Sequence, residues 1–288
     1  FVVGGVFNGD LDFGMGTMSA QGLDGFVARF EDPDTIKWQK QLTDQASPFG
    51  DQEVRALCVT SSRVFVTGVF AKDASYDLFP IDHGGSGTDD MFILALDLED
   101  GDLNGHATFT DTQQIVARDI ASLGGDVIVG GSFSGDLDFR GNTSPLSTAG
   151  AADGVVAALS PNLVGKWANR YGGADQDVVW SVAIDSADNV AAVGQFFGTV
   201  DFGTGPRTAT AMDAFVMKLN GVNGKHVWSA TFGGDGNDTA LAVAIESSPP
   251  NIVVAGEFAT EIDFGSGVHQ GAGSSDIFVA KFPPFLGP

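Results

Sequence analysis

The chain has 288 residues, of which 37 are acidic and 14 are basic, giving a formal net charge of -23 and a pI of about 4.1. This charge repels phosphate backbones and anionic headgroups, which argues against nucleic acid and membrane surfaces and leaves cations and basic proteins as partners. No apolar run approaches the roughly 18 to 20 residues of a spanning helix, so we expect no membrane insertion. Forty Gly and 23 Phe favour strands joined by tight turns, and we predict an all-β protein.

A long internal repeat organises the whole chain. Its core is a Gly-x-Phe strand that recurs at intervals of 63, 63, 63 and 62 residues. The five copies are residues 5–7, 68–70, 131–133, 194–196 and 256–258. A period of this length is typical of solenoids and propellers, whose units share their cores with their neighbours.

Each repeat resolves into four apolar segments of strand length, which we call segments a to d. The chain begins in segment b, the Gly-x-Phe strand, which runs on into residues 11–13, 137–139, 200–202 and 262–264; residues 76–79 depart from this pattern. Segment c opens with Asp24, Asp90, Asp153, Asp213 and Asp276. Segment d covers residues 38–42, 105–109, 167–171 and 228–232. Segment a, which opens the next repeat, covers residues 54–59, 116–121, 179–184 and 240–245.

Four strands per unit and five units predict a five-bladed β-propeller of four-stranded antiparallel blades. We expect a single domain over residues 1–288, with blades at about 1–42, 51–110, 114–171, 176–232 and 238–282. Segment a is predicted to be innermost, because one of its columns holds only small residues. The first blade then lacks its inner strand, and the last blade lacks its outer strand.

The repeat resembles the bacterial propeller repeats of the SBBP type. The resemblance rests on residues 213–219 (Asp-Ala-Phe-Val-Met-Lys-Leu), on Gly224 to Trp228, on Phe232-Gly233-Gly234 and on Val243-Ala244-Ile245, and it extends over essentially the whole chain. It implies a propeller fold and a secreted or cell-surface location. The chain begins at Phe1 inside a repeat, which indicates that a segment precedes it or has been removed.

The open ends of the array suggest a function. An unpaired strand edge invites pairing with another chain. We therefore predict a non-enzymatic, extracellular binding or assembly module. It would accept a strand from a segment outside this chain, from a protein partner or from another copy, at segment b of the first repeat or at residues 276–282.

Repeated aspartates are candidate calcium ligands. Asp12 with Asp24, and Asp201 with Asp213, would supply two carboxylates per blade across a hairpin. The turn that contains Asp235 and Asp238 matches the nonapeptide of calcium-binding β-helices, although one copy cannot form the oxygen cage that stacked copies build. The alternative for all six is that aspartate caps tight turns by accepting backbone N–H groups.

One column of segment a breaks the repeat. It reads Arg55, Arg118, Trp180 and Leu241, and so places two of the few basic residues beside a Trp where the central channel should open. Arginine and Trp suit a carboxylate or a sugar through bidentate bonds and stacking. The corresponding alternative function is a lectin-like propeller. The competing interpretation is that each Arg neutralises neighbouring aspartates.

Catalytic patterns are weak. His83, His106, His226 and His269 occupy unrelated positions without the spacing of a zinc site, and no nucleophile elbow occurs. Cys58 lies in an alanine column of segment a and is predicted to be a buried, inert thiol. We therefore predict no catalytic residues and no cofactor other than calcium.

Overall fold

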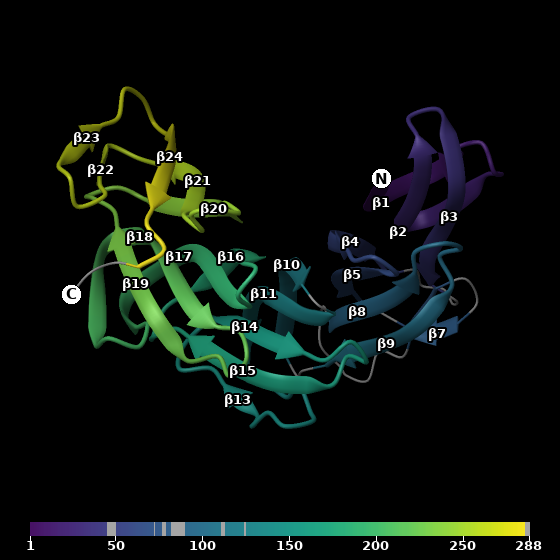
Figure 1. The fold of residues 1–288 in the computed structure, drawn as a ribbon, viewed down its shortest axis with the longest axis horizontal. Helices are drawn as coiled ribbons and strands as arrows, with labels where there is room; N and C mark the ends of the chain where they lie inside the picture. Colours follow the sequence, from purple (N-terminus) through teal and green to yellow (C-terminus); the bar gives the residue numbers. More distant parts are fainter. Residues whose placement is uncertain are drawn as a thin grey trace.

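The structure is a computed structural model that describes residues 1–285 except 45–49, 72, 77–78, 82–89, 111–112 and 124. All regular secondary structure in these residues is β-strand, which confirms the all-β prediction. The strands form five main antiparallel sheets, numbered 1 to 5 in chain order, and two short ribbons. The sheets lie side by side in an arc that the described residues do not close, with sheets 1 and 5 at its two ends (Figure 1).

Within the described ranges, sheets 2 to 4 have four strands each, whereas sheet 1 has five and sheet 5 has three. Sheet 1 consists of β1 (Val2–Leu11), β2 (Met18–Asp32), β3 (Thr35–Asp44), β6 (Ala74–Tyr76) and β7 (Phe79–Ile81). Sheet 2 consists of β4 (Gln52–Val59), β5 (Arg63–Phe70), β8 (Asp90–Asp97) and β9 (Leu103–Phe109). Sheet 3 consists of β10 (Gln114–Leu123), β11 (Asp126–Ser134), β14 (Asp153–Leu159) and β15 (Gly165–Tyr171).

The fourth and fifth sheets complete the arc. Sheet 4 consists of β16 (Val178–Ile184), β17 (Asn189–Asp201), β18 (Pro206–Asn220) and β19 (His226–Phe232). Sheet 5 consists of β20 (Asp238–Ile245), β21 (Ile252–Phe258) and β24 (Asp276–Phe282). The ribbons pair β12 (Asp136–Leu137) with β13 (Leu146–Ser147), and β22 (Glu261–Asp263) with β23 (Val268–Gln270).

The strand order follows the predicted segments. Segment a forms β4, β10, β16 and β20, and consecutive members of this set contact each other on the concave side of the arc. Segment d forms β9, β15 and β19, which are the outer strands of sheets 2 to 4, and β3 of sheet 1. In the described residues β1 pairs only with β2, and β24 pairs only with β21, so the inner edge of sheet 1 and the outer edge of sheet 5 are both open.

Sheet 1 differs from the expected three strands. The second repeat, where residues 76–79 depart from the pattern, sends β6 and β7 back to the outer edge of β3, with Leu42 opposite Tyr76. The other repeats close this region with a short hairpin, and three of them turn through Asp-Phe-Gly-x-Gly, which the second repeat lacks. The freed segment therefore pairs with an edge that would otherwise be exposed.

Four buried apolar clusters hold the arc together, one at each junction between successive sheets. Alternate residues of a strand enter different clusters. In β18, Phe215 and Met217 pack toward sheet 3, whereas Ala214 and Val216 pack toward sheet 5. At about 25 cal/mol per Å² of apolar surface removed from water, this two-sided burial is the main source of stability.

Each Trp of segment d fastens its sheet to the next one. The indole N–H groups of Trp38, Trp167 and Trp228 donate to the carbonyls of Leu98, Gly221 and Pro284, at 3.0, 2.6 and 2.9 Å. Beneath two of these rings lies a left-handed glycine, Gly101 (φ 75°) or Gly224 (φ 69°), where a Cβ would come within 2.8 or 2.6 Å of the indole.

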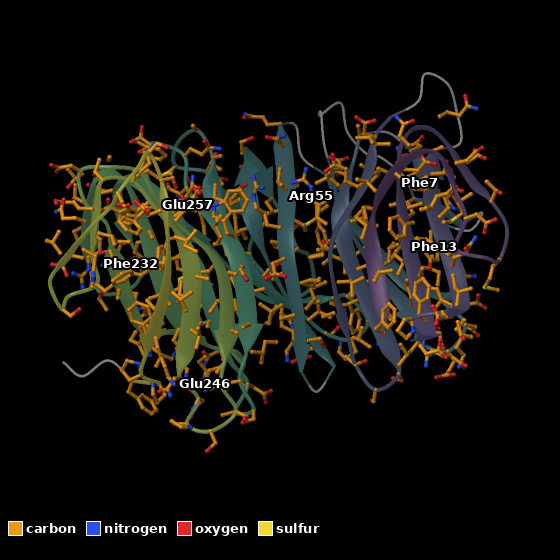
Figure 2. The ribbon with its side chains drawn as sticks, turned by 90° about the horizontal axis from the view of Figure 1, so that it is seen from above. Phe7, Phe13, Arg55, Phe232, Glu246 and Glu257 are labelled. Carbon is orange, nitrogen blue, oxygen red and sulfur yellow. The ribbon has the colours of Figure 1, made fainter. Side chains whose placement is uncertain are left out.

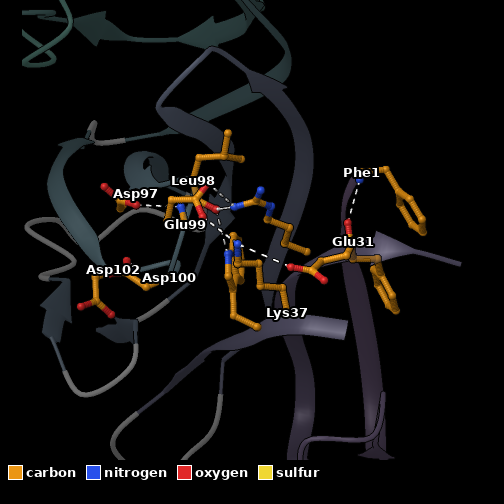
Figure 3. Close-up of polar contacts among 11 residues, drawn as sticks. Phe1, Glu31, Lys37, Asp97, Leu98, Glu99, Asp100 and Asp102 are labelled. Atoms are coloured by element: carbon orange, nitrogen blue, oxygen red, sulfur yellow. Dashed lines mark hydrogen bonds and ion pairs between the residues drawn. The ribbon is translucent and has the colours of Figure 1, made fainter. Parts of the chain in front are cut away.

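Charged side chains reinforce the junction of sheets 1 and 2. The ammonium group of Lys37 lies 2.6 Å from one carboxylate oxygen of Glu99, and the guanidinium of Arg29 lies 3.0 Å from the other. Arg29 also donates to the carbonyl of Leu98, so these contacts and the Trp38 bond meet at one turn. Figure 3 shows Lys37 reaching Glu99 at this turn, beside Leu98. The pKa of Glu99 is lowered, chiefly by its hydrogen bonds to Lys37 and Arg29.

We predict that Trp167→Phe lowers the free energy of unfolding by about 1 to 3 kcal/mol, because it removes the bond to Gly221 and leaves a small void. Urea denaturation would measure the effect. Val222→Ala, at a residue with 67% of its surface exposed, serves as the control and should change stability by less than about 0.5 kcal/mol. Equal stability of Trp167→Phe and the parent would contradict the role of this bond.

Candidate functional site

The position of segment a that differs from repeat to repeat forms a β-bulge in each of sheets 2 to 5, and we call these four bulges the bulge row. The pairing with segment b shifts register at the same place in β4, β10, β16 and β20. A bulge inserts one extra residue and redirects its side chain. The four extra residues are Arg55, Arg118, Trp180 and Leu241. Figure 2 looks onto the open side of the arc and shows Arg55 between the two end sheets.

Arg118 and Trp180 form the centre of this row. The guanidinium carbon of Arg118 lies 3.9 Å from the centroid of the Trp180 ring, in a cation–π contact. The indole N–H of Trp180 donates to the side-chain oxygen of Gln195 at 2.9 Å, and the hydroxyl of Thr239 donates to the same oxygen at 3.1 Å. Gln195 thus fixes the ring and links sheets 4 and 5.

The two arginines differ in whether a nearby carboxylate balances their positive charge. Arg55 lies 2.7 Å from the carboxylate of Glu53, so its charge is neutralised, although by a glutamate and not by the aspartates that the competing interpretation named. Arg118 has no ion pair within the described part of the chain, and its buried Nε lacks a hydrogen-bond partner. Burial, followed by the charge of nearby Arg55, lowers the pKa of Arg118. A half-buried, uncompensated cation in a protein of net charge -23 is a favourable place for an anion.

A hydrogen-bonded chain that the sequence did not reveal lies next to the bulges. The carboxylate of Asp119 accepts the hydroxyl of Ser181 at 2.7 Å and the backbone N–H of Val182 at 2.9 Å, and the Ser181 hydroxyl accepts the N–H of Val243 at 3.3 Å. Burial raises the pKa of Asp119 despite these bonds. The sequence feature that could have indicated this chain is the position directly after the bulge residue, where Asp119 and Ser181 stand in place of alanine.

Cys58 is half-buried rather than fully buried, and it packs with Ala56 against the cluster between sheets 2 and 3. Burial, with a smaller contribution from Asp119, raises the pKa of its thiol to about 12. The thiol is therefore protonated at neutral pH and is a poor nucleophile.

The aspartates of segment b close turns. Asp12 accepts the backbone N–H groups of Gly14 and Gly16 at 2.7 and 3.3 Å, and Asp201 accepts those of Gly203 and Gly205 at 2.7 and 3.0 Å. These two backbone bonds are the leading cause of the lowered pKa of Asp201. Turn capping is thus the use observed for both residues.

The pairing of these aspartates with segment c, as predicted from the sequence, is wrong. Asp24 lies opposite Phe7 and Asp213 lies opposite Phe196, each about five residues from Asp12 or Asp201 along the hairpin. At roughly 3.3 Å per residue this separation is about 16 Å, too far for one cation. Asp24 instead accepts the side-chain amide of Gln41 at 2.6 Å.

The structure brings Asp213 close to Asp238, which the sequence placed in separate motifs. A Cβ on Gly233 would lie within 2.4 Å of one and 2.9 Å of the other. Asp238 accepts the N–H groups of Gly234 and Ala259 at 2.9 and 3.2 Å, and burial, assisted by the charge of Asp213, raises its pKa to about 6. Burial also raises the pKa of Asp213. Asp235 is exposed in the same turn.

The same arrangement occurs one junction earlier. Asp177 accepts the N–H groups of Gly173 and Phe197 at 2.8 and 3.0 Å. Burial chiefly, with the charges of Asp153 and Asp175, raises its pKa to about 6. Where segment d ends and segment a begins, carboxylates of two successive repeats therefore meet in a buried corner.

No group of three or more His, Cys, Asp or Glu side chains placed to hold a metal occurs within the described ranges. His106 lies in β9, His226 in β19 and His269 in β23, while His83 lies outside the described residues. Calcium binding stays a prediction.

Comparison with known proteins adds little. No family model and no curated protein matches the chain. One similar solved structure is a europium-containing methanol dehydrogenase, with 11% identity, a TM-score of 0.35 and coverage of 95% of this chain and 67% of that one. Another is BamB from Moraxella catarrhalis, with 10% identity, a TM-score of 0.27 and coverage of 88% and 94%. Neither likeness supports an argument about function. Among the described residues, no helix is long and apolar enough to cross a membrane.

We predict that Asp238 makes stability depend on pH. Its folded-state pKa of about 6 lies above the ordinary value of 3.8, so the folded chain holds this proton more tightly than the unfolded chain. Its contribution to the free energy of unfolding is therefore complete below about pH 4 and is lost as pH rises through about 6, by at most about 3 kcal/mol.

Urea denaturation at several pH values would test this dependence. Asp238→Asn cannot titrate, so its stability should fall less than that of the parent between about pH 4 and about pH 7. Asp235→Asn, at the exposed neighbour, is the matched control and should follow the parent. An Asp238→Asn curve parallel to the parent's would contradict the raised pKa.

Proposed function

We propose that this chain is a non-enzymatic binding and assembly module, part of a five-bladed propeller of the SBBP type, that associates with other polypeptides through the ends of its arc. The observation that carries the proposal is an exposed apolar face on sheet 5, where Ile277 and Val279 are 88% and 73% exposed. Exposed apolar surface of this kind marks protein interaction sites. An extracellular or cell-surface location belongs to the same proposal and rests on the resemblance alone.

The other end of the arc supports the proposal. At the junction of sheets 4 and 5, Phe232 packs against Phe264, Phe278 and Phe282, with ring centroids 5.2, 5.7 and 5.6 Å apart. Sheet 1 presents the corresponding residues, Phe13, Phe26 and Phe30, in mutual contact at 5.3 and 5.7 Å. In the described residues no sheet precedes sheet 1, and this group is contacted by Phe1, which stacks on Phe30 at 5.0 Å, and by Phe7, whose ring meets Phe26 edge-on at 6.2 Å.

The two ends are therefore different surfaces, each of the type that packs against a sheet elsewhere in the arc. A contact between unlike surfaces on identical chains is heterologous, and it leads to rings or open filaments. The chain can thus extend an assembly in a defined direction.

Sedimentation velocity over a range of concentrations tests the proposal. We expect the parent to associate beyond its monomer mass of 29.8 kDa, and Ile277→Lys/Val279→Lys to remain monomeric, because two charges cannot be buried without partners. Val222→Lys, at another exposed valine, should behave as the parent. A parent that stays monomeric throughout would contradict self-assembly.

A second candidate function is recognition of an acidic carbohydrate at the bulge row. Arg118, which lacks an ion pair in the described residues, favours a carboxylate over a neutral sugar, because its guanidinium already covers one face of Trp180. We expect Arg118→Ala to weaken binding of oligogalacturonate at least about tenfold. Arg55→Ala should do so less, because Arg55 is already paired with Glu53. Calorimetric titration measures both, and equal binding by Arg118→Ala and the parent would exclude this site.

A further inference from the structure

The outer edge of β24 is built to receive one specific strand. We propose that β24 binds, by strand addition, an extended segment of another polypeptide that carries the pattern of residues 167–171 of this chain, namely a Trp, a basic residue and an aromatic residue. This inference rests on the proposed function and identifies its partner. In sheets 2, 3 and 4 the strand equivalent to β24 is paired with a fourth strand, whereas within the residues that the structure describes sheet 5 ends at β24.

A groove runs along this edge. Its volume is about 610 Å³, and it is lined by residues 277–283, which come from both faces of β24, and by the ribbon formed by β22 and β23. Phe264 and His269 line the ribbon side. In sheet 3 the corresponding ribbon strand, β13, contacts the fourth strand β15. The groove of sheet 5 therefore lies where a fourth strand lies in the other sheets.

A comparison of β24 with the equivalent strand β18 shows which side chains are exposed in sheet 5. In sheet 4, Ala214 and Val216 are buried in a cluster with Trp228 and Phe232 of the fourth strand and with sheet 5, and they have no exposed surface. Their equivalents Ile277 and Val279 lack both neighbours in the described residues and are 88% and 73% exposed.

The same contrast holds for a repeated ion pair. In sheet 4, Lys218 and Asp185 form a pair at 3.1 Å whose side chains are each 3% exposed. The corresponding pair of Lys281 and Glu246, at 2.7 Å, is 55% and 38% exposed. The repeat thus retains at β24 the side chains that lie buried in the complete sheet.

The register of the incoming strand follows from the complete sheets. In sheet 3, Trp167 lies opposite Ala158 and Tyr171 lies opposite Gly154. In sheet 4, Trp228 and Phe232 lie opposite the equivalent residues, Lys218 and Ala214. An added strand in this register places its Trp opposite Lys281 and its aromatic residue opposite Ile277. Both large side chains then fall on the face that carries the exposed apolar residues.

The charges around β24 indicate that the incoming strand carries a basic residue. In sheets 1 and 3 the segment d strand, β3 or β15, donates to the aspartate that opens segment c, from Gln41 to Asp24 and from Arg170 to Asp153, each at 2.6 Å. The equivalent residue on β24 is Asp276, which accepts the backbone N–H of Ala272 at 2.6 Å. Segment d is also rich in positive charge, since Lys37, Lys40, Lys166, Arg170 and Lys225 lie in or next to it. A basic residue opposite Phe278 would therefore pair with Asp276 in a strongly acidic protein.

A synthetic peptide with the sequence of residues 164–173 contains Trp167, Arg170 and Tyr171 and is the probe. We expect it to bind the parent protein in calorimetric titration. A peptide with Trp167→Ala and Tyr171→Ala should bind at least about tenfold more weakly, because it loses both side chains that cover the apolar face. Equal binding of the two peptides would overturn the proposed recognition pattern.

Variants of the protein locate the site. Ile277→Lys/Val279→Lys alters side chains that are exposed in the folded monomer, so it should fold normally and lose peptide binding at least about tenfold. Val222→Lys should bind as the parent. If the peptide binds the double variant undiminished, it has replaced a strand elsewhere in the arc, and the proposal is wrong.

A cross-link tests the register. In the register of sheet 3, Val279 lies opposite the peptide position of Asn169, because its equivalent Val156 pairs with Asn169. A protein with Cys58→Ala and Val279→Cys should form a disulfide with an Asn169→Cys peptide. It should react far more slowly with an Ala168→Cys peptide, whose thiol points to the opposite face. Equal reaction of both peptides would overturn strand addition.

The outcomes separate this inference from the proposed function. A parent protein that self-associates through Ile277 and Val279 but does not bind the peptide keeps the assembly function and overturns strand addition. Peptide binding by a protein that stays monomeric supports strand addition and removes self-assembly.

Discussion

The structure depends on one constraint: every sheet has two apolar faces, and each face must be covered by a neighbouring sheet. Strand β18 shows this, because Phe215 and Met217 enter the cluster with sheet 3 while Ala214 and Val216 enter the cluster with sheet 5. A sheet of this kind cannot be stable alone, and an array of such sheets is exposed only at its ends. The repeat, the arc and the exposed face of β24 all follow from this constraint.

The side chains of segment d connect each sheet to the following one. Its Trp reaches a carbonyl of the following sheet, and its aromatic residue packs among the phenylalanines there, as Phe232 does between Phe264 and Phe278. Each outer strand thus belongs to its own sheet by backbone pairing and to the next sheet by its side chains. A sheet without this strand lacks both an edge partner and the means of attaching a successor.

The acidity of the chain is partly structural. Asp12 and Asp201 close turns, and Asp177 and Asp238 each accept two backbone N–H groups in buried corners. A buried carboxylate near a second one resists ionisation, which is why burial and neighbouring charge raise the pKa of both Asp177 and Asp238 to about 6. The uncompensated charge of Arg118 stands out against this background, and it is located at a bulge, where a strand can present one side chain without losing its pairing on either side.

The sequence by itself determined the strands of segments a to d and their order within each repeat, because the alternation of apolar residues acts over a few neighbouring residues. It left the repeated aspartates open between calcium binding and turn capping. It also singled out the column of Arg55, Arg118 and Trp180, since a repeated fold exposes any position that breaks the repeat. Only the tertiary structure decided which side chains meet across sheets. Asp213 approaches Asp238 rather than Asp201, Gln195 holds Trp180, and β6 pairs with β3 of the preceding repeat. These contacts depend on how sheets stack and where pairing stops, which no local pattern encodes.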